Sequence, residues 1–150
     1  MNQGPKRVLF VCIGNSCRSQ MAEAFARAYG SDVIYPASAG LAPASEIAFD
    51  TMEAMHAKSL DLRDQFPKSL RHVGRIQFDL IVNMSGMSLP VDLKAPVIEW
   101  DVPDPITMEY EEHCDVRDLI ERRVMQLILE LRREKGEPKF TGLGSEWKKE

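Results

Sequence analysis

The stretch RVLFVCIGNSCRSQMAEAFAR, residues 7–27, decides the fold of this chain. Its first part, Arg7 to Cys12, is a short apolar run with β-branched and aromatic side chains, which predicts a buried strand. The residues Gly14–Ser16 then supply turn chemistry. A helix is predicted from Ser19 to Gly30, because apolar side chains recur there at helical spacing. A strand, a tight loop and a helix in this order open an α/β unit.

The rest of the chain continues the alternation of strands and helices. Pro36 either weakens the prediction of the next strand or places that strand at the edge of the sheet. Alternation of this kind predicts an α/β fold of three layers, a parallel sheet with helices on both faces. We expect one domain over residues 1–135 and a polar C-terminal tail over 136–150. The further strands are predicted at 33–39, 78–84 and 96–100, and the further helices at 47–57, at 67–73 and over the apolar stripe from Val116 to Leu131.

Length and composition limit the function classes. A chain of 150 residues can bury a core without disulfides or a metal, and 44% hydrophobic with 28% charged residues is typical of globular domains. The net charge of -4 argues against a general nucleic-acid binder. The apolar run from Val8 to Ile13 is too short for a signal peptide or a membrane span. Three cysteines without such a segment indicate reduced thiols, so we expect a cytoplasmic protein.

The loop between the first predicted strand and helix has the chemistry of an anion site. It contains a cysteine and an arginine separated by five residues (a CX5R pattern), at the strand end where open α/β sheets bind ligands. Curled round one centre, its backbone N–H groups make a nest for an anion, and the helix N-terminus adds partial positive charge. Gly14 and Asn15 tolerate the positive φ angles of such a curl, and Arg18 offers a bidentate donor. The predicted oxyanion-binding residues are Ile13, Gly14, Asn15, Ser16, Cys17, Arg18 and Ser19.

Cys12 lies beneath the predicted anion. Inward N–H groups and a nearby cation favour the thiolate form of a cysteine, so we predict that Cys12 is the nucleophile of covalent catalysis, with Ser19 hydrogen-bonded to its sulfur. The alternative is that Cys12 is a small buried hydrophobe, which is the usual state of a lone cysteine. The strand before it, the helix after it and the Gly-Asn-Ser turn favour the catalytic interpretation. A nucleotide-binding glycine-rich loop is excluded, because no Lys-Ser/Thr pair follows a glycine.

The stretch VLFVCIGNSCRSQMAEAFAR resembles the first strand, loop and helix of the low-molecular-weight protein tyrosine phosphatases and of the arsenate reductases that share their fold. Of two shorter segments, Ser38–Gly40 resembles the end of the family's second strand and Asp79–Val82 resembles a later buried strand. The resemblance implies a four-stranded parallel sheet, with the loop between the first strand and the first helix, and catalysis without a metal or other cofactor. It implies that Cys12 is the nucleophile, Arg18 the transition-state clamp, and Asn15 and Ser19 supports of the loop and the thiolate.

Asp104 is the candidate general acid. Expelling an oxygen leaving group needs a proton donor opposite the nucleophile, and the second step needs a base. Pro103 and Pro105 stiffen the segment around Asp104, which matches the Asp-Pro acid of the similar family. The alternative is an ordinary turn start, and Asp101 is a second candidate for the acid. The family's phosphatases usually follow Asp-Pro with aromatic residues, whereas residues 106–108 are Ile-Thr-Met here, which weakens the case for phosphotyrosine as the substrate.

Two enzyme functions fit these residues. Our first hypothesis is a phosphomonoesterase, similar to the protein tyrosine phosphatases, that acts on a phosphoprotein or another monoester through a phosphocysteine. The alternative is an arsenate reductase, because arsenate mimics phosphate and Ser19 is followed by Gln20, where the phosphatases usually have proline. A third interpretation, a non-catalytic oxyanion binder, is disfavoured because binding alone needs no thiolate.

The cysteine pattern bears on the reductase hypothesis. Reductases coupled to thioredoxin carry two further cysteines just after a strand equivalent to 78–84, whereas residues 85–88 are Ser-Gly-Met-Ser here. Reduction would therefore need an external thiol, such as glutathione, mycothiol or the thiol of thioredoxin. Cys17 has the alternatives of a reversible disulfide with Cys12 or no redox role, and Cys114 is the only distant thiol. The three histidines lack metal-ligand spacing, and we expect neither a metal nor a nucleic acid or membrane partner.

Overall fold

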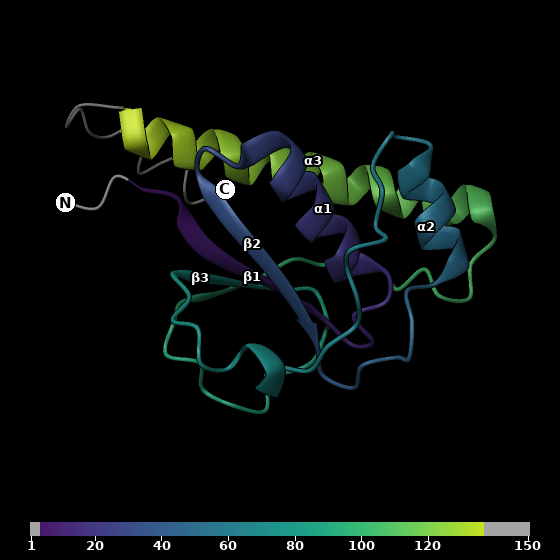
Figure 1. Cartoon of the computed structure of the whole chain (residues 1–150), viewed down its shortest axis with the longest axis horizontal. Coiled ribbons are helices and arrows are strands. Elements are labelled where there is room, and N and C mark those ends of the chain that lie inside the picture. The colour runs from purple at the N-terminus through teal and green to yellow at the C-terminus, as the bar shows by residue number, and fades with distance from the viewer. Residues whose placement is uncertain (1–3, 137–150) are drawn as a thin grey trace.

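A parallel sheet of four strands is the centre of the computed structural model, which describes residues 4–136 (Figure 1). The strand order is β2-β1-β3-β4, and every neighbouring pair is parallel. The predicted four-stranded parallel α/β fold is therefore confirmed. The elements are β1 (Lys6–Cys12), α1 (Arg18–Gly30), β2 (Ile34–Gly40), α2 (Phe49–His56), the 3₁₀ helix η1 (Arg71–Val73), β3 (Leu80–Asn83), β4 (Val97–Glu99) and α3 (Tyr110–Gly136).

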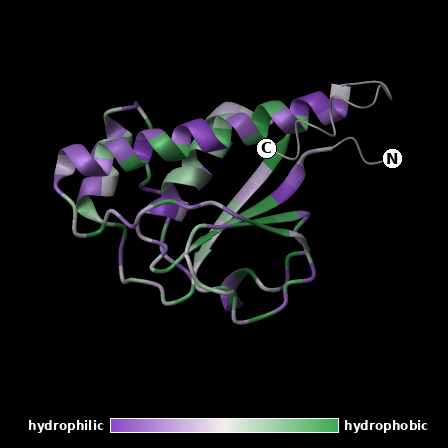
Figure 2. Ribbon diagram, turned by 180° about the vertical axis from the view of Figure 1, so that it is seen from behind, coloured by the Kyte–Doolittle hydropathy of each residue, from purple (hydrophilic) through white to green (hydrophobic). Residues whose placement is uncertain are grey.

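The alternation of side chains along β1 divides the core between the two faces of the sheet. Val8 and Phe10 pack with the apolar side chains of α1 and α3, and Figure 1 shows these two helices side by side along one face. Leu9 and Val11 point to the opposite face, where the cover is η1 with its flanking loops. Figure 2 shows hydrophobic colour along the strands and alternating hydrophobic and hydrophilic turns along α3, as expected of a helix with one buried stripe.

The predicted elements are present, and the differences lie at their ends. β2 is an edge strand, as Pro36 indicates. α2 begins at Phe49, two residues later than predicted, because Ala48 is extended (φ -60°, ψ 141°) and its N–H bonds the carbonyl of Ser16. The helix predicted over 67–73 is reduced to η1, so the second helical layer is one 3₁₀ turn with its loops.

The proposed division at residue 136 stays a prediction. Gly136 is the last residue of α3, and residues 137–150 lie outside the part of the chain that the structure describes. Within residues 4–136, no helix combines the length and the apolar character needed to cross a membrane.

The contact between Gly30 of α1 and Ile128 of α3 yields a stability prediction. A Cβ placed on Gly30 would lie 2.6 Å from Cγ1 of the fully buried Ile128. We expect Gly30→Ala to lower the free energy of unfolding by about 1–3 kcal/mol, the usual cost of overpacking a core. Urea denaturation measures the change, with Gly136→Ala as control, because a Cβ there meets no atom within 4 Å. Equal stability of the two variants would contradict the prediction.

Candidate active site

The loop between β1 and α1 turns all of its carbonyl groups outward. Every carbonyl from Cys12 to Cys17 accepts a hydrogen bond of 2.8–3.1 Å from a group outside the loop or in the first turns of α1. The segment 41–48, which follows β2, supplies four of these donors and runs along the outside of the loop. The pairs are Cys12 with Leu41, Ile13 with Ala42, Gly14 with Ala44, Ser16 with Ala48, Asn15 with the Gln20 side chain, and Cys17 with Met21.

Outward carbonyls leave the N–H groups of the loop facing its centre. In a trans peptide the C=O and the following N–H point in opposite directions, and the described chain has no cis peptide bond. Asn15 adopts a left-handed conformation with φ of 51°, which turns the chain back toward α1. The outward carbonyls are those that the predicted nest of amides from residues 13 to 18 requires, and its binding of an anion stays a prediction.

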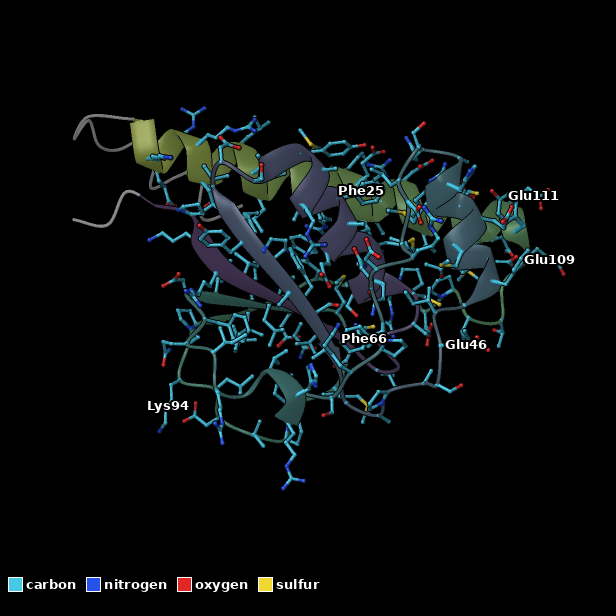
Figure 3. All side chains as sticks on the ribbon, viewed as in Figure 1. Phe25, Glu46, Phe66, Lys94, Glu109 and Glu111 are labelled. Atoms are coloured by element: carbon cyan, nitrogen blue, oxygen red, sulfur yellow. The ribbon has the colours of Figure 1, made fainter. Side chains whose placement is uncertain are left out.

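Side chains outside the loop hold this conformation. The amide oxygen of Asn15 accepts from the N–H of Lys68 at 2.9 Å. The buried Gln20 donates to the carbonyls of Asn15 and Phe66 at 2.9 and 3.0 Å, and Gln65 donates to the Gln20 side chain at 2.7 Å. Figure 3 shows Phe66 beside the beginning of α1, where this network lies. Asn15, the left-handed residue of the loop, is therefore held both at its side chain, by Lys68, and at its backbone carbonyl, by Gln20.

Cys12 lies at the end of β1 with its sulfur against Ser19. The Ser19 hydroxyl is 2.8 Å and the Ser19 N–H is 3.4 Å from the Cys12 sulfur. Asn15 donates to the same hydroxyl at 2.7 Å, so that oxygen can donate its own proton to the sulfur. The structure thus brings Asn15 and Ser19 to the positions predicted for supports of the thiolate.

Arg18 is buried, and the two edges of its guanidinium have different partners. Nη1 donates to the carbonyls of Met84 and Val102, at the ends of β3 and of the segment after β4. Nη2 lies 3.5 Å from a carboxyl oxygen of Asp104. Nε has no hydrogen-bond partner, and within residues 4–136 it is the only buried side-chain nitrogen or oxygen without one. Nε and Nη2 form one bidentate edge, which is therefore available for two oxygens of an anion.

Asp104 stands at the rim of the same site. Its Oδ1 accepts from the N–H of Ile106 at 3.2 Å, while Oδ2 faces Arg18. The side chain is 42% exposed, so it can meet a substrate and exchange a proton with solvent. Asp101, the second candidate for the acid, is also exposed, but no hydrogen bond or ion pair of the described residues links it to the loop.

The other two cysteines have distinct surroundings. Cys17 is buried, and burial raises the pKa of its thiol, which keeps it protonated near neutral pH. Cys114, on α3, is partly exposed, and its interaction with Tyr110 raises the pKa of that phenol. A disulfide between Cys12 and Cys17 stays a prediction, since all three thiols are free. Within residues 4–136, no group of three or more His, Cys, Asp or Glu side chains is placed to hold a metal ion.

Comparison with known proteins identifies the family. The model of the low molecular weight phosphotyrosine protein phosphatases matches residues 7–90. The chain belongs to this family. It is 31% identical over 130 residues to a glutaredoxin arsenate reductase from Synechocystis sp., covering 84% of this chain and 98% of that protein.

Solved structures agree with this assignment. The structure of an arsenate reductase in the phosphate binding state is similar with a TM-score of 0.74 and 30% identity, over 84% of this chain and 98% of that chain. A low molecular weight protein tyrosine phosphatase from T. tengcongensis is similar with a TM-score of 0.69 and 28% identity, over 83% of this chain and 99% of that chain. The family therefore contains both reductases and phosphatases similar to this chain.

The sequence did not reveal the backbone groups far from the loop in the chain that hold Arg18 and the loop in place. The carbonyls of Met84 and Val102 anchor Arg18, but a backbone acceptor leaves no signal in the sequence. Gly40 has a recognisable signal, a glycine at the end of an edge strand. A Cβ there would lie 2.7 Å from the Ile13 carbonyl and 2.9 Å from the Asn15 nitrogen. Only glycine lets β2 approach the loop this closely.

That contact predicts the effect of Gly40→Ala. The added Cβ meets backbone atoms, so the loop must shift, and a displacement of about 1 Å can cost up to about 100-fold in function. We expect phosphate affinity, measured by isothermal titration calorimetry, to fall by at least about tenfold. Gly74→Ala is the matched control, because its Cβ would make only an ordinary contact at 3.4 Å. Unchanged phosphate affinity in Gly40→Ala would contradict the prediction.

Proposed function

We propose that this protein is an arsenate reductase that uses an external thiol. The observation that carries the proposal is the unpartnered, buried Nε of Arg18, beside an amide-lined loop that ends on the Cys12 sulfur. An anion with tetrahedral oxygens satisfies these donors, and arsenate has that shape and charge. The names of the similar proteins and the Ile-Thr-Met sequence after Asp104–Pro105, in place of aromatic residues, support arsenate over an aryl phosphate.

In the first step the Cys12 thiolate attacks arsenic. The S–As bond forms while the As–O bond opposite to it breaks, and Asp104 gives its proton to the departing oxygen, which leaves as water. Arg18 and the loop amides stabilise the charge on the three remaining oxygens. The oxidation state of arsenic does not change in this step.

In the second step an external thiol takes the arsenic. The Cys12 residue is only 2% exposed and Ser19 contacts its sulfur, so attack at arsenic from the open side is less hindered than attack at the sulfur. Asp104 removes the proton of the thiol, the new S–As bond forms, and Cys12 departs as a thiolate. A second thiol then attacks the sulfur of this adduct, the S–As electron pair passes to arsenic, and arsenite and a disulfide result.

The turn after β3, where thioredoxin-coupled reductases carry further cysteines, offers no thiol to replace the external one. The turn after β3 is closed by its own hydrogen bonds, since Asn83 accepts from Ser85 and donates to the Met87 carbonyl at 2.7–3.0 Å. This turn contains serine and methionine side chains and no cysteine. We therefore propose glutathione, mycothiol or a thioredoxin-like protein thiol as the electron donor.

Phosphomonoester hydrolysis is the second candidate. It is favoured by the position of Asp104, whose carboxyl group can protonate an alkoxide and then activate water on the same open side. The first step is the same in both reactions. The second differs only in whether a thiol or water attacks the intermediate.

The reductase proposal predicts arsenite formation that depends on Cys12 alone among the cysteines. Wild-type protein and Cys114→Ser should form arsenite from arsenate with glutathione, mycothiol or a thioredoxin system, and Cys12→Ser should not. Arsenite is measured by chromatography with elemental detection. Vanadate-inhibited hydrolysis of para-nitrophenyl phosphate without arsenite formation would select the phosphatase function instead, and full activity of Cys12→Ser would contradict both.

The acid role predicts a slower first step in Asp104→Asn. The substitution keeps the size of the side chain and removes its proton, so we expect kcat for arsenate reduction to fall about 10²–10⁴-fold. Asp92→Asn is the matched control, because Asp92 lies on an exposed turn and pairs with Lys94. Equal rates of Asp104→Asn and wild type would exclude Asp104 as the acid.

A further inference from the structure

The partner of the Asn15 carbonyl differs from those of its neighbours in the oxyanion loop. The other five carbonyls between Cys12 and Cys17 accept from backbone N–H groups, whereas that of Asn15 accepts from the side-chain amide of Gln20, with Nε2 at 2.9 Å from the oxygen. The Asn15 carbonyl and the Ser16 N–H belong to one trans peptide and point in opposite directions. The side chain of Gln20 therefore decides whether the Ser16 N–H faces the centre of the loop.

Within the loop, Asn15 is also the residue whose backbone most needs such a contact. Its φ of 51° lies in the left-handed region, which a residue other than glycine keeps only where its surroundings hold it there. Asn15 donates to the Ser19 hydroxyl and accepts from the Lys68 N–H, and both of these bonds are made by its side chain. The bond from Gln20 is the one that acts on its carbonyl. Loss of this bond would leave the peptide between residues 15 and 16 free to turn its oxygen toward the centre of the loop.

The amide group of Gln20 is oriented by its partners. Gln20 is fully buried, and its Nε2 lies 2.9 Å and 3.0 Å from the carbonyl oxygens of Asn15 and Phe66, which can only accept. These two carbonyls therefore use both protons of the amide, and its oxygen, Oε1, accepts from Nε2 of Gln65 at 2.7 Å. Every polar atom of the Gln20 side chain is satisfied in this one orientation.

A fixed charge at the far end of the network supports the same orientation. Oε1 of Gln65 accepts from the guanidinium of Arg27 at 3.1 Å, and a guanidinium can only donate. Arg27 is in turn paired with Glu23 at 2.7 Å. Gln20, Glu23 and Arg27 follow one another at spacings of three and four residues, on one face of α1. The hydrogen bonds thus run in one direction, from Arg27 through Gln65 and Gln20 to the loop.

We propose that Gln20 is a positioning residue for the oxyanion loop, which aims the Ser16 N–H at the bound anion by holding the Asn15 carbonyl outward. The inference rests on the proposed function of this loop as an oxyanion site, and it assigns a role to a side chain that does not touch the anion. Without the amide of Gln20, a carbonyl oxygen would take the place of one N–H donor. This change would remove a hydrogen bond to the anion and add a repulsive dipole.

Gln20→Met tests this role, because methionine is unbranched and of similar length but has no amide protons. We expect the affinity for inorganic phosphate, measured by isothermal titration calorimetry, to fall about 10–100-fold, which corresponds to the loss of one hydrogen bond to a charged group. Gln77→Met is the matched control, because the Gln77 amide also donates to two carbonyls, those of Phe78 and Lys94, which are not part of the loop. Unchanged phosphate affinity in a folded Gln20→Met protein would overturn the proposal.

Gln65→Met separates this role from a general one in joining α1 to the segment that contains Phe66. The substitution removes the partner of Oε1 but leaves both amide protons of Gln20 on their carbonyls. We expect a much smaller loss of phosphate affinity than in Gln20→Met. Equal losses in the two variants would show that the network acts on the fold as a whole, and would overturn the positioning role. Thermal unfolding establishes that the compared proteins are folded at the temperature of the titration.

The amide proton of Ser16 gives a readout that a general loss of stability does not reproduce. In backbone NMR spectra of the wild type, inorganic phosphate should shift the amide protons of Gly14 and Ser16 downfield, because both donate to the anion. In Gln20→Met at saturating phosphate, the Ser16 shift should be lost and the Gly14 shift kept. Equal changes at both residues would overturn the positioning role.

The wild-type spectrum is decisive even if Gln20→Met does not fold. A Ser16 amide proton that does not respond to bound phosphate in the wild type would overturn the inference about Gln20. A wild-type protein that shows the Ser16 response and forms no arsenite from arsenate would instead overturn the proposed function.

Discussion

The outward direction of six consecutive carbonyls is the constraint on which the rest of the structure depends. The amides from residue 13 to residue 18 face one centre only because each carbonyl from Cys12 to Cys17 has a partner outside the loop. These partners come mainly from the segment 41–48 and from α1, so the end of β2 and the late start of α2 are consequences of the same requirement. Without these partners the loop conformation would cost free energy, because its N–H groups would point to one centre that holds no acceptor. The same arrangement of N–H groups attracts an anion.

Arg18 adds a buried positive charge to that arrangement. Removing a guanidinium from water costs several kcal/mol unless hydrogen bonds and opposite charge offset the loss. Two carbonyls satisfy one edge, and Asp104 only partly neutralises the other at 3.5 Å. The Nε of Arg18 is left without a hydrogen-bond partner, and the oxyanion of the proposed function would supply one, which would link ligand binding to local stability. The contact between Arg18 and Asp104 also holds the candidate acid beside the proposed anion site. The charges of Arg18, Asp104 and an anion would therefore act on one another.

The fold and the centre of the site were predictable because their signals are local. Alternating strands and helices, the turn after β1 and the Cys12-to-Arg18 spacing are all written within short windows of sequence. The contacts that refine the site join residues far apart in the chain, such as Gln20 with Gln65 and Arg18 with Val102. No periodicity reports such pairs. His113 illustrates the limit, because no spacing in the sequence reports its buried partner Thr51, which lies 62 residues earlier in the chain.

The loop itself does not decide between reduction and hydrolysis, because the two proposed reactions differ in the molecule, a thiol or water, that attacks the intermediate. In the two proposed reactions a covalent intermediate would form on Cys12, and either water or a thiol would use the Asp104 carboxylate, which lies 3.5 Å from Arg18, as its base. The sulfur of Cys12 is shielded by Ser19, so in the proposed reductase reaction a thiol would attack arsenic and not sulfur. A site built this way needs no second cysteine near β3, because the incoming thiol occupies the place that water takes in a phosphatase. The absence of cysteine from residues 85–88 is therefore compatible with reductase chemistry and determines only where the electrons come from.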